Sequence, residues 1–99
     1  MFPGVMIKPV WGEKLMMVHI SLEDGSEVPL HSHPHEQMGI GLEGEFELII
    51  AGESQMIKRG DGYFVPSGVE HIAVASRGNA VALDMFSPPR EDFIQLFSE

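Results

Sequence analysis

The chain contains no cysteine among its 99 residues. A disulfide framework and a thiolate metal site are therefore both excluded. Any metal that this protein binds must be held by nitrogen and oxygen ligands.

Basic residues are also scarce, with 6 Lys and Arg against 15 Asp and Glu, and the formal net charge is −9. Nucleic acids and anionic membranes repel such a surface, so we expect neither as a partner. No apolar run approaches the roughly 20 residues that cross a bilayer. The segment 1–9 lacks the basic start and the apolar stretch of a signal peptide, so we expect a cytoplasmic protein.

The residues that are present fit one small folded domain, 1–99. Hydrophobic residues make up 43% of the chain and charged residues 21%, which excludes a disordered protein. Alternation of apolar and polar residues predicts short strands at 15–22, 37–42, 45–50, 55–58, 63–65, 71–75 and 80–86. Many short strands separated by glycine-containing turns predict an all-β sandwich or barrel.

Only the C-terminal tail has a helical pattern. Ser87 is a candidate N-cap, two prolines follow it, and Glu91 and Asp92 lie where the helix dipole favours carboxylates. Three apolar residues fall on one face at helical spacing, namely Phe93, Leu96 and Phe97. Because this helix is short, it needs a docking surface to be stable.

Four of the five histidines lie in the segment 31–35 and at position 71. His31 and His33 are two residues apart, so in an extended segment both imidazoles point to one side. Gln37 adds an amide oxygen, and His71 closes the set if the sheet folds back. Such donors suit a divalent transition metal, which needs several converging ligands. The alternative is a group of solvated loop histidines, with His71 hydrogen-bonded inside the fold.

The spacing around these residues resembles the two motifs of the cupin family. Residues 25–44 follow the pattern Gly-x5-His-x-His-x3-Gln-x6-Gly, and residues 60–71 follow Gly-x5-Pro-x-Gly-x2-His. The resemblance implies a small jelly-roll β-barrel that holds one divalent metal. Its ligands would be His31, His33, Gln37 and His71. Ni, Zn, Mn, Fe and Co all accept this donor set.

Two positions depart from the cupin pattern. The family usually has Glu where this chain has Gln37, and often Asn where it has Ala75. With three imidazoles and an amide every ligand is neutral, so a bound metal keeps its full positive charge and attracts anions more strongly. The alternative is a loosened ligand set that binds metal poorly.

Small residues share strand faces with the expected ligands. They are Gly39 and Gly41 in the strand of Gln37, and Ala73 and Ala75 in the strand of His71. We expect a cavity beside the metal, because a filled barrel would carry larger side chains there. The alternative is a β-bulge, or crowding of these positions by neighbouring aromatic rings.

The opposite strand faces carry bulky apolar residues, namely Met38, Ile40, Leu42, Ile72, Val74, Val81, Leu83 and Met85. A small acidic monomer would leave many of them exposed to water. Together with the apolar face of the tail helix, they lead us to expect a homodimer.

A carboxylate interrupts the apolar run 80–86. Asp84 shares its strand face with Phe86, and a carboxylate inside such a strand needs a partner, solvent or a function. One interpretation is a structural ion pair between Asp84 and Arg90 that closes the barrel.

This tail and the segment 31–37 resemble the KdgF-type cupins of pectin and alginate breakdown. That subfamily linearises the 4,5-unsaturated uronates that polysaccharide lyases release, and its metal ligands include a Gln, as at Gln37. The resemblance implies that Asp84, Phe86 and Arg90 line the site and that the substrate is a small anionic sugar acid. Asp84 would then act as the acid and base, Arg90 would bind the substrate carboxylate during catalysis, and Phe86 would bound the sugar ring.

Two other functions stay open from the sequence. Three histidines can also hold Fe(II), as in a cupin dioxygenase. A non-catalytic small-molecule-binding module is the third candidate, since a fold alone does not define a function.

Overall fold

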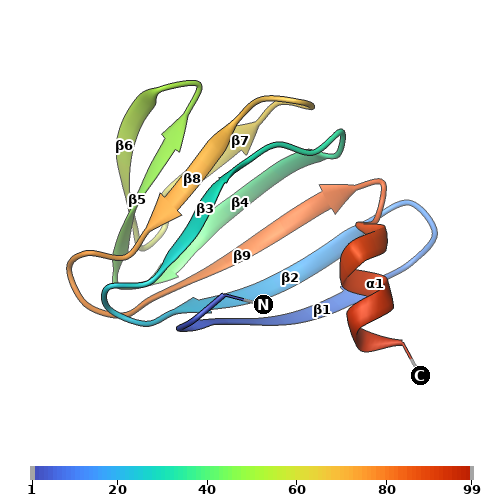
Figure 1. Cartoon of the computed structure of the whole chain (residues 1–99), viewed down its shortest axis with the longest axis horizontal. Helices are drawn as coiled ribbons and strands as arrows, with labels where there is room; N and C mark the ends of the chain where they lie inside the picture. Colours follow the sequence, from blue (N-terminus) through green and yellow to red (C-terminus); the bar gives the residue numbers. More distant parts are fainter. Residues whose placement is uncertain (1, 99) are drawn as a thin grey trace.

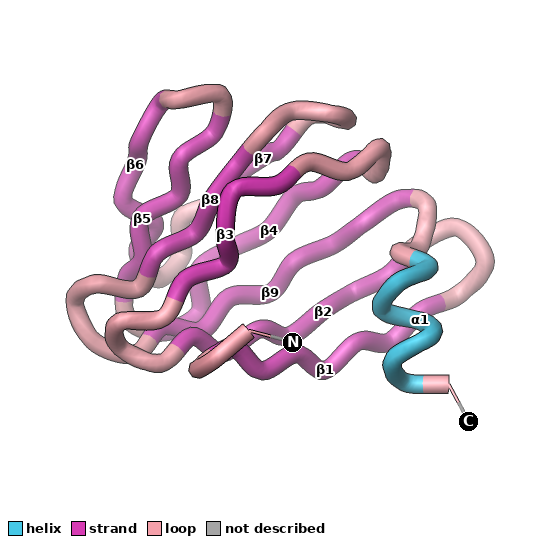
Figure 2. The backbone as a smooth tube through the Cα atoms, in the orientation of Figure 1, coloured by secondary structure: helices cyan, strands magenta, loops and turns pink. Residues whose placement is uncertain are grey.

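The computed structural model describes residues 2–98, which form nine strands and one helix (Figures 1 and 2). The strands are β1 (Val5–Trp11), β2 (Met16–Leu22), β3 (Glu27–His31), β4 (Glu36–Glu43), β5 (Glu45–Ile50), β6 (Glu53–Lys58), β7 (Gly62–Val65), β8 (His71–Val74) and β9 (Ala80–Ser87). The helix α1 spans Glu91–Phe97. The expected all-β class with a short C-terminal helix is confirmed.

The strands form two antiparallel sheets that face each other. One sheet has the order β1-β2-β9-β4-β7, and the other has the order β3-β8-β5-β6. The chain passes between the sheets after β2, β3, β4, β6, β7 and β8, which gives the jelly-roll arrangement visible in Figure 1. The expected jelly-roll barrel is therefore confirmed.

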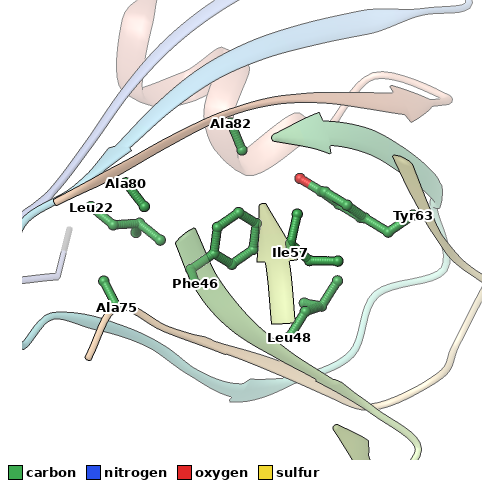
Figure 3. Packing of buried hydrophobic residues seen from close by; sticks show 8 residues of the cluster. All are labelled: Leu22, Phe46, Leu48, Ile57, Tyr63, Ala75, Ala80 and Ala82. Atoms are coloured by element: carbon green, nitrogen blue, oxygen red, sulfur yellow. The ribbon is translucent and has the colours of Figure 1, made fainter. Parts of the chain in front are cut away.

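Two apolar clusters fill the space between the sheets. The larger cluster, drawn in Figure 3, consists of Leu22, Phe46, Leu48, Ile57, Tyr63, Ala75, Ala80 and Ala82. The second lies toward the helix and consists of Ile7, Met16, Val18, Phe86 and Phe93. Inward-facing residues of both sheets supply these clusters, as the alternation in β2, β5 and β9 predicts.

The tail helix begins later than its expected N-cap. Ser87 is the last residue of β9, and its hydroxyl donates a hydrogen bond to the Lys14 carbonyl (2.8 Å) instead of capping the helix. Arg90 occupies the N-cap position without a side-chain cap. Within residues 2–98, no helix has the length and apolar character needed to cross a membrane.

The expected buried face of this helix is wrong in two of its three residues. Phe93 is buried against Phe86, but Leu96 is 61% exposed and Phe97 is 48% exposed. Ile94 packs beside Phe93 in their place. The helix therefore docks on the barrel through its first turn.

Candidate metal centre

Two strands and the loop after one of them bring three histidines together. His31 ends β3 and pairs directly with His71, the first residue of β8. His33 lies in the loop between β3 and β4, where it is 8% exposed. One ring nitrogen from each of the three histidines lies within 4.8 Å of the others. The structure thus places the histidines of both sequence motifs in one group that could hold a metal ion.

Backbone carbonyls orient all three imidazoles in the same way. Their Nδ1 atoms lie at hydrogen-bond distance from the carbonyl oxygens of Pro29 (2.7 Å, to His31), His35 (3.0 Å, to His33) and Val69 (2.9 Å, to His71). A carbonyl can only accept, so each Nδ1 carries the proton and each Nε2 presents its lone pair. This is the arrangement that metal-bound histidines adopt.

The surroundings of the histidines favour the neutral rings that bind metals. Burial lowers the pKa of His33 to about 4, and the nearby charge of Arg90 acts in the same direction. Burial also lowers the pKa of His71. These two imidazoles are therefore neutral at neutral pH, and their Nε2 atoms do not need to lose a proton before coordination.

Gln37 adds a fourth donor atom from β4. Its side-chain oxygen Oε1 lies 3.1 Å from Nε2 of His33, and Gln37 is 7% exposed. Both atoms are acceptors when Nδ1 of His33 holds the proton, so they do not hydrogen-bond to each other. Two ligand atoms bound at about 2.1 Å and at right angles to one ion lie about 3 Å apart. The pair therefore fits a shared cation.

Asp84 is buried beside this group, on β9. It is 8% exposed, and it accepts hydrogen bonds from the Tyr63 hydroxyl and from the Gln37 side chain. Burial raises the pKa of Asp84 to about 6, although both hydrogen bonds and the charge of Arg90 favour its ionised form. Burial, followed by the Asp84 charge, also raises the pKa of the Tyr63 hydroxyl.

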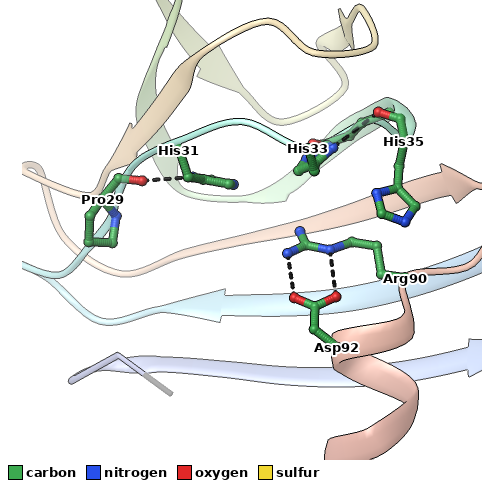
Figure 4. A network of polar contacts seen from close by, with 7 residues as sticks. Pro29, His31, His33, His35, Arg90 and Asp92 are labelled. Carbon is green, nitrogen blue, oxygen red and sulfur yellow. Dashed lines mark hydrogen bonds and ion pairs between the residues drawn. The ribbon is translucent and has the colours of Figure 1, made fainter.

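Arg90 pairs with a different acid from the one that the sequence suggested. Its Nε and Nη2 atoms donate to the two carboxylate oxygens of Asp92, at 3.2 and 2.8 Å (Figure 4). Among residues 2–98, Arg90 forms an ion pair with Asp92 and not with Asp84. The interpretation of an Asp84–Arg90 pair is therefore wrong. The hydrogen bond and charge of Arg90 outweigh partial burial and lower the pKa of Asp92.

Aromatic rings hold the Arg90 guanidinium against the cavity. Its central carbon lies 4.0 Å from the ring centroid of Phe93 and 5.1 Å from that of Phe86. The arginine side chain is only 13% exposed. In Figure 4 its third nitrogen, Nη1, points away from Asp92 and toward the side on which His31 and His33 lie.

Phe86 separates the histidines from the helix. It is 3% exposed, and its ring meets His33 edge to face at 5.5 Å and Phe93 at 6.0 Å. Because Phe86 shares its strand face with Asp84, one strand brings the acid and this ring to the same wall.

A cavity of about 300 Å³ joins these groups. Its polar lining is His31, Ser32, Gln37, Tyr63, His71, Asp84, Arg90 and Asp92. Its apolar lining includes Val18, Ile20, Leu22, Val28, Phe46, Ala73, Ala82 and Phe86. The expected cavity beside the ligand group is therefore present, and its lining combines polar and apolar residues.

The two glycines assigned to this cavity do not line it. A Cβ atom at Gly39 would overlap the Asp84 carboxylate and the Tyr63 ring, and one at Gly41 would overlap the Lys58 carbonyl. Ala73 does line the cavity, whereas Ala75 is fully buried in the larger apolar cluster. Crowding is therefore the reason for both glycines, and the cavity interpretation is wrong for these positions.

Two residues of the site were absent from the sequence-based set, Tyr63 and Asp92. Tyr63 lies on an inward-facing position of β7, directly opposite Gly39 of β4. The sequence does not reveal this pairing, because it depends on how β4 and β7 align in the fold. Asp92 sits in the first turn of the helix, where its charge was assigned to the helix dipole alone.

A family model for the cupin domain matches residues 18–86. The chain therefore belongs to the cupin family, as its two-sheet barrel and its three-histidine group indicate. Within the family it is similar to the pectin degradation protein KdgF of Dickeya dadantii (strain 3937). The two share 35% identity over 85 residues, which cover 85% of this chain and 77% of that protein.

Solved structures give the same result. The structure of KdgF from Halomonas sp. matches with a TM-score of 0.87 and 32% identity, covering 92% of this chain and 84% of that one. An RmlC-like cupin from Shewanella frigidimarina NCIMB 400 matches with a TM-score of 0.86 and 36% identity, covering 91% and 81%. The resemblance to KdgF-type cupins that the sequence motifs indicated is confirmed.

Proposed function

We propose that this protein opens the ring of 4,5-unsaturated uronate monosaccharides and converts them to linear keto-uronates. The observation that carries the proposal is a single cavity that joins His31, His71 and Gln37 to Asp84, Phe86 and Arg90. The similarity to a pectin degradation protein of Dickeya dadantii supports the choice of a uronate as the substrate.

The residues that would hold the metal are His31, His33, Gln37 and His71. Their lone pairs converge, and the two most buried rings are neutral at neutral pH. A divalent ion bound there would act as a Lewis acid that polarises the oxygens of the substrate.

Arg90 would bind the substrate carboxylate. The chain carries a net charge of −9, so an anionic substrate needs a local cation inside the cavity. Since Asp92 holds the Nε and Nη2 edge, the substrate carboxylate would bind at Nη1 or share the guanidinium with Asp92. Phe86 would bound the sugar ring on the side next to His33.

Ring opening requires one proton to leave an oxygen and one to reach a carbon. When the anomeric hydroxyl loses its proton, a carbonyl forms there and the bond to the ring oxygen breaks. The electrons of that bond leave an enolate, and its protonation at carbon gives the ketone. Substrate and product are isomers, so the step needs no oxidant or reductant.

Asp84 would carry these protons on its carboxylate oxygens. It lines the cavity, and burial raises its pKa to about 6, so the group can take up and return a proton near neutral pH. The hydrogen bonds from Tyr63 and Gln37 hold the carboxylate in one position during both transfers.

The proposal is tested by incubating the metal-loaded protein with unsaturated uronates freshly made by a polysaccharide lyase. Opening the ring destroys the double bond conjugated with the carboxylate, so the ultraviolet absorbance of the substrate should fall faster than in buffer. A His33→Ala protein treated in the same way is the control. An equal rate with wild type, His33→Ala and buffer would contradict the proposal.

A further inference from the structure

Tyr63, Asp84 and Gln37 form a buried chain of hydrogen bonds that runs toward the three histidines. Tyr63 is 8% exposed, and its hydroxyl donates to Oδ1 of Asp84. Figure 3 shows this hydroxyl pointing from the apolar cluster toward β9, the strand of Asp84. Gln37 lies two residues from Gly39, the direct neighbour of Asp84 across the sheet, and its side chain also bonds to this carboxylate. Asp84 therefore links a residue that cannot touch the metal to one that could.

Gly39 leaves the space in which Tyr63 and Asp84 meet. This residue pairs with Tyr63 on one side and with Asp84 on the other, in the centre of three neighbouring strands. Any side chain at Gly39 would overlap both the tyrosine ring and the carboxylate. Glycine inside a strand lowers the stability of that strand. Its presence at position 39 therefore indicates that the Tyr63–Asp84 contact has a role that offsets this loss.

The contact with Asp84 determines which end of the Gln37 amide faces the histidines. An ionised carboxylate only accepts hydrogen bonds, so Asp84 selects the NH2 end of the amide. The opposite end, Oε1, must then face His33, where it lies 3.1 Å from Nε2. If the amide were reversed, its oxygen would face a carboxylate and its NH2 group would face the metal ligands. The first contact is repulsive, whereas the second would let the NH2 group donate to the lone pair on Nε2 of His33 and would leave no amide oxygen facing the metal position.

We propose that Tyr63 is a positioning residue that, through Asp84, holds the Gln37 oxygen in the orientation needed to bind the metal. The inference rests on the metal site of the proposed function but not on its substrate. A neutral amide ligand has two chemically different ends, unlike a carboxylate, so it needs a partner that fixes its orientation. Tyr63 stabilises the partner that does this.

The substitution Tyr63→Phe tests the proposal, because it removes the hydroxyl and keeps the ring in the apolar cluster. The measurement is the affinity for Ni²⁺ or Mn²⁺, titrated calorimetrically into chelator-treated protein. We expect the affinity to fall about tenfold, the lower range found when outer partners of metal ligands are removed. An affinity within twofold of the wild-type value would overturn the proposal.

Phe46→Leu is the matched control for damage to the apolar cluster. The Phe46 ring packs edge to face on Tyr63, with centroids 6.0 Å apart, and it has no polar group that could hydrogen-bond to Asp84. This variant should lower the thermal midpoint while leaving the metal affinity within twofold. If Phe46→Leu weakened metal binding as much as Tyr63→Phe, the effect would be one of packing and the proposal would be wrong.

A double substitution tests whether Tyr63 acts through Asp84. Asp84→Asn gives Gln37 a neutral neighbour that can both donate and accept, so the amide orientation is no longer imposed. We expect Asp84→Asn alone to weaken metal binding about tenfold. Adding Tyr63→Phe to it should then change the affinity less than twofold. A second tenfold loss in the double variant would mean independent roles and would overturn the proposal.

These measurements separate the inference from the proposed function. Metal affinity is measured without any uronate, so an inactive protein whose metal binding depends on Tyr63 would support the inference and contradict the proposed reaction. If the protein opens the uronate ring but Tyr63→Phe leaves its metal affinity unchanged, the proposed reaction is supported and the inference about Tyr63 is contradicted.

Discussion

The guanidinium of Arg90 is held by Asp92 through two hydrogen bonds, of 3.2 and 2.8 Å, two residues further along the chain. Asp92 is 58% exposed in its side chain, whereas Arg90 is 13% exposed and lies over two aromatic rings. The rings therefore fix the position of the arginine, and Asp92 mainly lowers its effective charge. A carboxylate substrate must compete with this neighbour.

Asp92→Asn should strengthen substrate binding. The amide keeps the shape of Asp92 but removes the negative charge that opposes the substrate carboxylate. We expect KM to fall about threefold, the scale of a partly exposed ion pair, while kcat changes little. Steady-state kinetics with an unsaturated uronate measure both constants. A rise in KM would mean that Asp92 orients Arg90 for binding and does not compete with the substrate.

One divalent metal should bind per chain through His31, His33, Gln37 and His71. Metal analysis of purified His33→Ala should show most of this metal lost. His35→Ala is the matched control, because its ring is outside the three-histidine group and its backbone carbonyl still accepts from His33. Equal metal content in wild type and His33→Ala would refute the ligand assignment.

Substitutions of Asp84 and of Arg90 should change different kinetic constants. Asp84→Asn keeps the shape but removes the base, so with the metal site saturated kcat should fall about 10²-fold or more with little change in KM. Arg90→Lys keeps the charge but loses the planar fork, so KM should rise with a smaller effect on kcat. Thermal midpoints measured beside the kinetics distinguish these effects from unfolding. Unchanged turnover in a folded Asp84→Asn protein would remove Asp84 from the mechanism.

The outer face of the five-stranded sheet should bury itself against a second copy of the chain. Direct cross-strand neighbours form an uncharged row over all five strands: Val10, Met17, Met85, Met38 and Phe64. Each of the five is between 38% and 57% exposed. Acidic residues outnumber basic residues in the rest of the chain, so two copies repel each other least across this uncharged row.

Light scattering at micromolar concentration should therefore give the mass of a homodimer. Met38→Lys should convert it to a monomer, because it places two charges, one from each copy, within the contact. Leu30→Lys is the matched control, since Leu30 is 60% exposed on the other sheet. A monomeric wild type, or an unchanged mass in Met38→Lys, would contradict this arrangement.

Strands with one buried face were predictable from the sequence. The alternation over 45–50 matches β5 without error, and six of the other strands were found to within two residues at each end. The two missed strands, β1 and β3, each lie at an edge of a sheet. Each contains a proline and few buried residues, because an edge strand needs neither every backbone donor nor a full apolar face.

The grouping of His31, His33 and His71 was predictable because the spacing of the two motifs is a property of the chain itself. The helix face, the glycines and the partner of Arg90 were not, because each depends on which residues meet across the fold. Gly39 is small because Tyr63 and Asp84 meet there, although they lie 21 residues apart in the sequence. No local pattern distinguishes that crowding from a cavity.

The identity of the product tests the central claim most directly. Metal-loaded protein and an unsaturated uronate should be mixed in a sealed vessel, with dissolved oxygen recorded and the product examined by NMR and mass spectrometry. Ring opening predicts a linear keto-uronate of the same mass as the substrate and no oxygen consumption above that of the protein-free control. An unchanged cyclic substrate, or a product formed with uptake of oxygen as in a dioxygenase, would contradict the account.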